Sequence, residues 1–206
     1  VDAPLERVLE FYRDRGCRGL GEVTANMPFL HPKVQNLCRA LQEVGMPMTI
    51  HIAPELGVNY GLHDDPGLPG LGRTLARFPE LKIIGHSQPF WAEISRLDTP
   101  SDRYGYPDYP VRGEGVVPKL MRRYPNLYGD LSAGSGHNAL ARDPEHAVQF
   151  IEEFQDRLMF GTDITSPTTA VPQPDFLKGL RDEGKISEEI CEKILRTNAE
   201  KLLDLD

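Results

Sequence analysis

The chain has 206 residues, of which 39% are hydrophobic and 26% are charged, a balance typical of a globular protein with one sizeable core. The net charge is −8, from 31 acidic and 23 basic residues, and the basic residues form no cluster. This argues against nucleic acid as the main partner, because such binding depends on clustered Lys and Arg. No apolar run approaches the ~20 residues needed to span a bilayer, so no membrane partner is expected.

The three cysteines, Cys17, Cys38 and Cys191, are widely spaced and form no CxxC motif. This pattern is typical of reduced thiols in a cytoplasmic protein, and cytoplasmic localisation is expected. The chain opens at Val1, enters a helical pattern within a few residues and shows no signal peptide.

The first half of the chain alternates between helical and extended patterns. A helix is expected between Asp2, as its cap, and Gly16, because apolar residues recur there at helical spacing. A second helix is expected from Pro32 to a stop at Gly45. The other expected elements of this half are strands at 18–25, 47–53 and 81–86 and a helix at 69–78.

The second half begins with a long connection, residues 88–113, which holds four prolines and three tyrosines. A loop of this length in a compact domain is usually a lid or a binding loop. Asp143 and Pro144 predict the start of a later helix, and Ser187 predicts the cap of the last one. The other expected elements are helices at 115–124, 174–183 and 187–203 and strands at 126–132 and 157–163.

The expected strands alternate with helices and are nearly uninterrupted apolar runs. This alternation predicts an α/β fold with a parallel sheet that helices cover. In such a sheet the carboxyl ends of the strands lie at one common edge, where polar side chains usually belong to a site.

Four polar side chains lie at these carboxyl ends, namely Glu22, His51, His86 and Asp163. Each has a structural alternative, since a lone His is often only hydrogen-bonded, Asp163 can cap a turn and Glu22 can pair with Arg18. Together, imidazole nitrogens and carboxylate oxygens are the usual ligands of Zn²⁺ and also suit Mn²⁺. The set therefore predicts a divalent metal site at this edge.

Five segments carry a resemblance to a known family: Gly21-Glu22-Val23, Thr49–Ile52, Ile84–Ser87, Phe160–Pro167 and Ile194–Leu203. They resemble the second half of the amidohydrolase superfamily, in particular its amidohydrolase-related branch (amidohydrolase 2), which includes lactonases and decarboxylases. The resemblance implies a (βα)₈ TIM-barrel fold in which residues 18–25 are the fourth strand and 157–163 the eighth.

The chain departs from that family in two respects. A barrel normally needs about 250 residues, and the His-x-His pair of the family's first strand occurs nowhere in this sequence. We therefore expect residues 1–206 to be one domain, the C-terminal portion of a barrel with about five βα units, and the missing ligands to lie upstream of Val1.

The resemblance also implies a role for each strand-end residue. His51 would be a metal ligand, His86 would bind a second metal or polarise the substrate carbonyl, and Glu22 would match a carboxylate that bridges two metals. Asp163 would bind metal and act as the catalytic base. The implied reaction is attack of metal-activated water on an amide, ester or lactone carbonyl, with Asp163 passing the proton to the leaving group.

Residues near the mouth are weaker candidates for substrate contact, with ordinary structural roles as the alternative. They are Tyr60, His63, Trp91 and Arg112 on overhanging loops and His137 in the loop after the strand at 126–132. Arg112 would suit a small molecule that bears a carboxylate. Asp130 either lines the pocket or accepts a hydrogen bond at its strand end.

Three other functions stay open. The same ligands would serve a non-oxidative decarboxylase of an aromatic or unsaturated acid. A chain that has lost the metal would be a non-catalytic binding protein or an inactive fragment. A TatD-type nuclease shares the order of the ligands, but the acidic charge balance counts against it. The sequence also leaves a homo-oligomer open.

Overall fold

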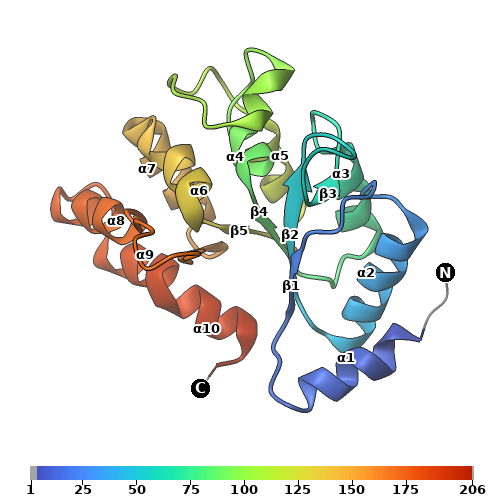
Figure 1. Ribbon diagram of the computed structural model, residues 1–206. Coiled ribbons are helices and arrows are strands. Elements are labelled where there is room, and N and C mark those ends of the chain that lie inside the picture. Colours follow the sequence, from blue (N-terminus) through green and yellow to red (C-terminus); the bar gives the residue numbers. More distant parts are fainter. Residues whose placement is uncertain (1–3, 206) are drawn as a thin grey trace.

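The computed structural model describes residues 4–205, and a parallel sheet lies at its centre (Figure 1). Its strands are β1 (Leu20–Val23), β2 (Met48–Ala53), β3 (Leu62–His63), β4 (Ile83–His86), β5 (Leu127–Asp130) and β6 (Leu158–Met159). The order across the sheet is β1-β2-β4-β5-β6, β3 pairs with β2, and all of these pairs are parallel. Each expected strand range contains a strand, so the parallel α/β architecture is confirmed. The sequence does not predict β3, which has only two residues.

Helices follow the strands as the sequence predicts. They are α1 (Leu5–Arg13), α2 (Pro32–Val44), α3 (Pro69–Arg77), α4 (Gln88–Ala92), α5 (Val116–Arg123), α6 (Ala133–Ala141), α7 (Pro144–Phe154), α8 (Gln173–Asp182), α9 (Glu188–Glu192) and α10 (Asn198–Leu203), with a 3₁₀ turn η1 (Pro100–Tyr104) and a π-helical turn η2 (Lys193–Thr197). Gly45 ends α2 with φ 75°, and the Ser187 hydroxyl accepts the Ile190 N–H at 3.2 Å, so both predicted helix ends are confirmed. The expected cap Asp2 lies outside the described residues.

The strands gather at the centre of the molecule and the helices surround them (Figure 1). α1 packs on α2 beside β1 and β2, whereas η2 and α10 pack on β6 at the other end of the sheet. Met48, Ile50 and Ile52 of β2 are fully buried. Burial of each such side chain contributes about 1.5–3 kcal/mol, which explains why apolar runs in the sequence locate the strands well.

The connection 88–113 is more regular than expected, because it begins with α4. A Cβ atom at Gly85 would lie 2.2 Å from the Phe90 ring, so only glycine lets α4 pack this closely on β4. Trp91 is 1% exposed, and its Nε1–H donates to the Asp130 carbonyl at 2.7 Å. The expectation that Trp91 overhangs the mouth from a loop is wrong, since its apolar neighbours form a helix that packs into the core.

A second helix that the sequence does not predict is α6, which follows β5. Its glycines have low helix propensity, but one of them allows a close approach to the strand end. A Cβ atom at Gly136 would lie 2.3 Å from the Leu131 carbonyl carbon. His137 therefore lies on a helix and not in a surface loop, and its ring packs edge-on against Phe176 with 5.8 Å between centroids.

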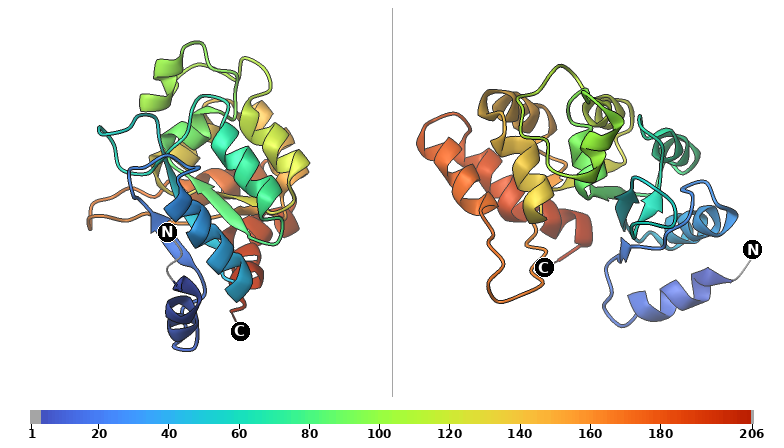
Figure 2. Two further views of the ribbon diagram at one scale, coloured as in Figure 1. Left: turned by 90° about the vertical axis from the view of Figure 1, so that its right-hand side faces the viewer. Right: turned by 45° about the horizontal axis from the view of Figure 1, so that its top comes forward.

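The two ends of the strand order, β1 and β6, do not pair with each other among residues 4–205. Figure 2 shows the connection from β6 to α8, in orange, as a long loop that projects from the body of the molecule. Within the same residues, none of the helices has the length and hydropathy of a membrane-spanning segment.

Asn126 ties the turn before β5 to the turn before β4. Its side chain is buried, and its amide nitrogen donates to the carbonyls of Phe78 and Leu81, both at 3.0 Å, and of Leu75 at 3.4 Å. One side chain thus satisfies backbone acceptors at the end of α3 and at the start of the next strand.

We expect Asn126→Ala to lower the free energy of unfolding by about 2–3 kcal/mol, because buried carbonyls lose their donor. Urea denaturation followed by circular dichroism measures the change. The matched control is Asn138→Ala, since Asn138 donates one bond, to the Pro107 carbonyl at 3.0 Å. That control should lose about 1 kcal/mol or less, and equal losses in the two variants would contradict the expectation.

Candidate metal centre

Three of the predicted metal ligands come together at the carboxyl ends of neighbouring strands. Glu22 lies on β1, His51 on β2 and His86 at the end of β4, and His51 is the register partner of His86 in the β2–β4 ladder. Glu22 Oε1 lies 2.5 Å from His51 Nδ1 and 3.4 Å from His86 Nε2. One ligand atom from each side chain lies within 4.8 Å of the other two. We call these residues the Glu-His-His cluster.

His86 is fixed in orientation by a pair of polar side chains from β5 and the residues after it. Asp130 Oδ2 lies 3.0 Å from His86 Nδ1, and the Ser132 hydroxyl lies 3.1 Å from the same nitrogen and donates to Asp130 Oδ2 at 2.7 Å. A metal-binding His commonly donates its other ring N–H to a carboxylate in this way. His86 Nε2 is thereby left facing Glu22 and Asp163.

The surroundings of the cluster favour the ionised form of Glu22. The hydrogen bond from His51 lowers the pKa of Glu22, although partial burial acts in the opposite direction. Burial alone would lower the pKa of His86, but the hydrogen bond and charge of Asp130 and the charges of Glu22 and Asp163 together raise it. A cation would take the place of the proton that these carboxylates attract to His86.

Asp163 lies at the rim of the cluster. Its Oδ2 atom is 3.9 Å from His86 Nε2, and its side chain is 46% exposed. Its φ of 53° falls in the left-handed region that few residues other than glycine adopt. Asp163 lines a cavity of about 190 Å³ together with Glu22 and His86. It can therefore act on a molecule bound beside the cluster, although the three close ligand atoms come from the other residues.

The donor set fits a divalent cation. One carboxylate and two buried imidazoles are ligands that Zn²⁺ and Mn²⁺ accept, and three protein ligands leave coordination positions for water or substrate. The support of His86 by Asp130 is the arrangement expected around such a ligand.

Tyr60, a weaker candidate for substrate contact in the sequence, lies beside the cluster. Its ring centroid is 4.3 Å from that of His51, and both residues line a cavity that continues toward Gln88 and Tyr104. Burial raises the pKa of Tyr60, and the charges of Glu22 and Asp163 raise it further, so the phenol keeps its proton near neutral pH.

The structure places the other expected substrate contacts away from the cluster. His63 lines a separate cavity with Asp65, its nearest charged partner at 4.0 Å. Arg112 pairs with Asp98 at 3.7 Å, and no contact joins it to the cluster within residues 4–205. Trp91 is in the core and His137 is on α6, as described above.

Two residues near the site were not singled out from the sequence. Ser132, in contact with His86 and Asp130, follows the strand end by two residues, and that short spacing is a usable signal. Tyr106 interacts with Tyr60 and accepts a hydrogen bond from Gln88 at 3.4 Å. No sequence signal marks Tyr106, because the connection 88–113 has no regular pattern.

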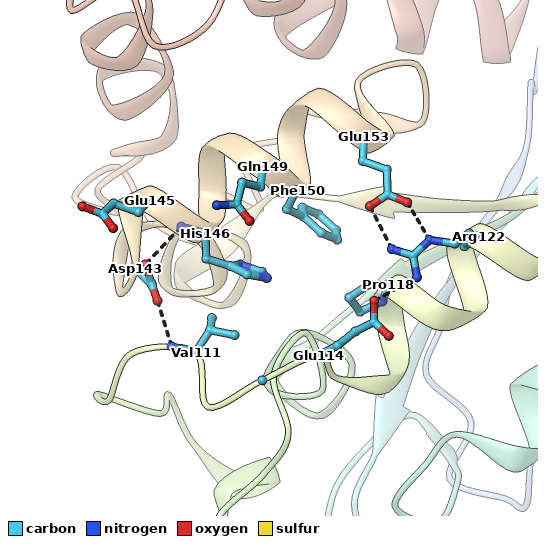
Figure 3. Close-up of a pocket in the computed structure, with 11 residues that line it drawn as sticks. Val111, Glu114, Pro118, Arg122, Asp143, Glu145, His146, Gln149, Phe150 and Glu153 are labelled. Atoms are coloured by element: carbon cyan, nitrogen blue, oxygen red, sulfur yellow. Dashed lines mark hydrogen bonds and ion pairs between the residues drawn. The ribbon is translucent and has the colours of Figure 1, made fainter.

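A larger cavity, of about 490 Å³, lies away from the cluster between α5, α7 and residues 111–114 (Figure 3). Arg122, Glu114, Glu153 and Asp143 of its lining already have partners. Arg122 bonds Glu114 at 2.8 Å and Glu153 at 2.7 Å, and Asp143 accepts the His146 N–H that begins α7. The larger cavity therefore offers no set of converging free groups comparable to the cluster.

Solved structures share this fold. An amidohydrolase from Burkholderia multivorans with bound HEPES matches with a TM-score of 0.59 and 19% identity, covering 100% of this chain and 71% of that one. The Burkholderia multivorans amidohydrolase with bound zinc matches with a TM-score of 0.52 and 15% identity, with coverage of 100% and 71%. A candidate 2-pyrone-4,6-dicarboxylic acid hydrolase from Pseudomonas putida matches with a TM-score of 0.56 and 16% identity, with coverage of 100% and 70%.

The family relationship is shown by a match that covers almost the whole sequence. No curated protein matches the chain significantly. The family model described as Amidohydrolase, however, matches residues 1–205. The parallel sheet and its helices resemble those of the TIM-barrel amidohydrolases, of which the chain spans part. The chain therefore belongs to the amidohydrolase family and is an enzyme of the metal-dependent amidohydrolase superfamily.

Proposed function

We propose that the chain is a metal-dependent hydrolase of a small molecule with an amide, ester or lactone carbonyl. The observation that supports this most directly is the Glu-His-His cluster, whose ligand atoms lie within 4.8 Å of one another at the carboxyl ends of the strands. Metal dependence is a property of the family. The choice of Zn²⁺ or Mn²⁺ and the assignment of Glu22, His51 and His86 as ligands, with Asp163 as an additional ligand, belong to the proposal.

Each residue around the cluster has a separate role in the proposed hydrolysis. When bound, the cation supplies Lewis acidity toward carbonyl and water oxygens. Asp163 accepts the proton of the attacking water and returns it to the leaving group, since its half-exposed carboxylate lines the same cavity. His86 holds the cation or orients the carbonyl through Nε2, and Asp130 keeps that nitrogen directed at the cavity.

Two structural relatives agree with this proposal. One Burkholderia multivorans structure contains zinc, and the Pseudomonas putida protein is described as a candidate dicarboxylic acid hydrolase. We accordingly propose a carboxylate-bearing small molecule as the substrate class.

The first expectation concerns metal affinity. The chain should bind zinc, and His51→Ala should weaken binding by at least about tenfold, because the loss of even a supporting partner costs about 10–100-fold. Competition with a chromophoric chelator measures the affinity. The matched control is His63→Ala, since His63 lies outside the cluster and its nearest charged partner is Asp65. The assignment fails if the unmodified chain binds no zinc or if both variants bind it equally.

The second expectation concerns the support of His86. Asp130→Asn keeps the size of the side chain but removes the charge beside His86 Nδ1, so zinc affinity should fall about 10–100-fold. Asp65→Asn, at an exposed carboxylate far from this bond, should leave the affinity unchanged. The same competition assay applies, and unchanged affinity in Asp130→Asn would show that Asp130 does not position His86.

The third expectation concerns the reaction. The metal-loaded chain should incorporate ¹⁸O from labelled water into the products of a panel of lactones, esters and amides. Asp163→Asn, assayed with zinc in saturating excess because the variant also loses a proposed ligand, should lower the rate by about 10²–10⁴-fold, the usual contribution of a general acid–base group. Release of CO₂ from aromatic acids without ¹⁸O uptake would overturn hydrolysis and favour decarboxylation.

A further inference from the structure

The connections at the mouth of the candidate site carry exposed apolar side chains. Of the eleven large hydrophobic residues that are exposed within residues 4–205, seven lie in connections that follow strands. One of these, Leu30, lines the separate cavity with His63. The other six come from the loops after β2 and β6 and the connection after β4, namely Leu56, Val58, Tyr60, Tyr104, Tyr106 and Ile164. In the left-hand view of Figure 2, the loops after β2 (teal) and β6 (orange) project from the same side of the molecule. Exposed apolar groups that gather beside a cavity usually mark a binding surface.

Tyr60 contacts the Glu-His-His cluster directly. Its ring centroid is 4.3 Å from that of His51, yet the residue is 60% exposed. Gly61 fixes this position, because its φ is 111° and its N–H donates to the Thr24 carbonyl at 2.8 Å. A Cβ atom at Gly61 would lie 2.7 Å from the His51 carbonyl oxygen, so only glycine brings Tyr60 this near to the cluster.

Two more tyrosines lie beside Tyr60. Tyr104, on η1, lines the same cavity of about 100 Å³ as His51 and Tyr60. Tyr106 follows η1 and lies close enough to Tyr60 for the two phenols to interact electrostatically. It also contacts Gln88, another residue of that cavity. We call Tyr60, Tyr104 and Tyr106 the tyrosine rim.

Two hydroxyls of the tyrosine rim are already engaged within the chain. The Tyr104 hydroxyl donates to Glu55 Oε2 at 3.0 Å, and the Tyr106 hydroxyl accepts a hydrogen bond from the Gln88 amide at 3.4 Å. A Cβ atom at Gly134 would lie 3.1 Å from the Tyr106 hydroxyl oxygen, so this end of the side chain packs against α6. Both tyrosines are nevertheless about half exposed, and their rings are the part left for a ligand.

The cavity beside the tyrosine rim is lined mainly by uncharged groups. Its arginine, Arg103, is 1% exposed, and its Nε atom lies 3.0 Å from Glu93 Oε1, so this charge is balanced within the fold. The apolar part of the wall comes from Ile52, Pro54 and Pro89. Tyrosine rings are large, rigid surfaces that bind apolar groups at a low cost in conformational entropy. The lining therefore favours an uncharged, apolar group.

We propose that the tyrosine rim binds an apolar group of the substrate, an alkyl chain attached to the reacting carbonyl. The inference rests on the proposed function, because a carbonyl held at the Glu-His-His cluster brings the adjoining chain against the ring of Tyr60. The substrate is accordingly an amide, ester or lactone with an apolar acyl part. Tyr60 is the residue that determines specificity for this part, since its ring lies between the cluster and the rest of the rim.

N-methylhexanamide is the probe for this subsite, with N-methylacetamide as its short match. The ¹⁵N-labelled, metal-free chain is titrated with each, and the backbone amide resonances of Gln88 and Tyr104 are followed. Full burial of one methylene raises affinity about fourfold, so the longer amide should bind at least about tenfold more tightly even when its chain is only partly buried. Tyr60→Ser should reduce this preference to about threefold or less, because it removes the ring beside His51.

Two further variants keep the test decisive. Tyr106→Ser should weaken binding of the longer amide by at least about threefold, as expected for loss of an aromatic contact. The matched control is Tyr12→Ser, since Tyr12 lies on α1 and is 52% exposed against 51% for Tyr106. This control should keep the full preference for the longer amide.

Equal affinity for the two amides overturns the inference, and so does an unchanged preference in both Tyr60→Ser and Tyr106→Ser. Co-sedimentation with phosphatidylcholine vesicles that Tyr60→Ser abolishes, without a preference between the amides, would assign the tyrosine rim to a lipid surface and overturn the inference as well.

The zinc and amide titrations separate this inference from the proposed function. Preferential, saturable binding of N-methylhexanamide in a chain that binds no zinc would reject the metal-dependent reaction and support the apolar subsite. Zinc binding without that preference would reject the apolar subsite alone.

Discussion

The candidate site depends on the register of β2 against β4. His51 and His86 are partners in this parallel ladder, and a shift of one residue would turn one imidazole to the opposite face of the sheet. The ladder is in turn fixed by buried residues, since Ile50 of β2 pairs with Gly85 of β4. Gly85 accommodates the Phe90 ring on its own side. The core packing that fixes the register of β2 against β4 therefore also fixes the positions of the two imidazoles.

The sequence predicts the parts of the fold that burial alone determines. Apolar runs locate the main strands, and helical spacing with caps such as Ser187 locates most helices. The sequence does not reveal β3, which forms because a short segment passes the end of β2, or α6, whose glycines disfavour a helix in isolation. α6 depends on the close contact of Gly136 with the end of β5, which is a tertiary interaction.

The site residues, too, divide into those that the sequence predicts and those that depend on tertiary contacts. Glu22, His51 and His86 can be predicted because strand ends of a parallel sheet converge, and this holds whatever the loops do. Loop residues cannot be placed in this way. Arg103 and Arg112 lie on one connection and look alike in sequence, but only tertiary contacts bury the first and expose the second. Substrate contacts are therefore the part of the site that sequence patterns determine least.

Because one ligand of the cluster lies on β1, metal binding is coupled to the stability of this strand. Within residues 4–205 β1 pairs with β2, and its register shifts between Leu20 and Val23. Glu22 belongs to β1, whereas both imidazoles belong to interior strands. A cation shared by the three side chains would link β1 to β2 and β4 through its ligands. Metal loading and the local opening of β1 are then linked equilibria, in which slower amide exchange at residues 20–23 accompanies tighter metal binding.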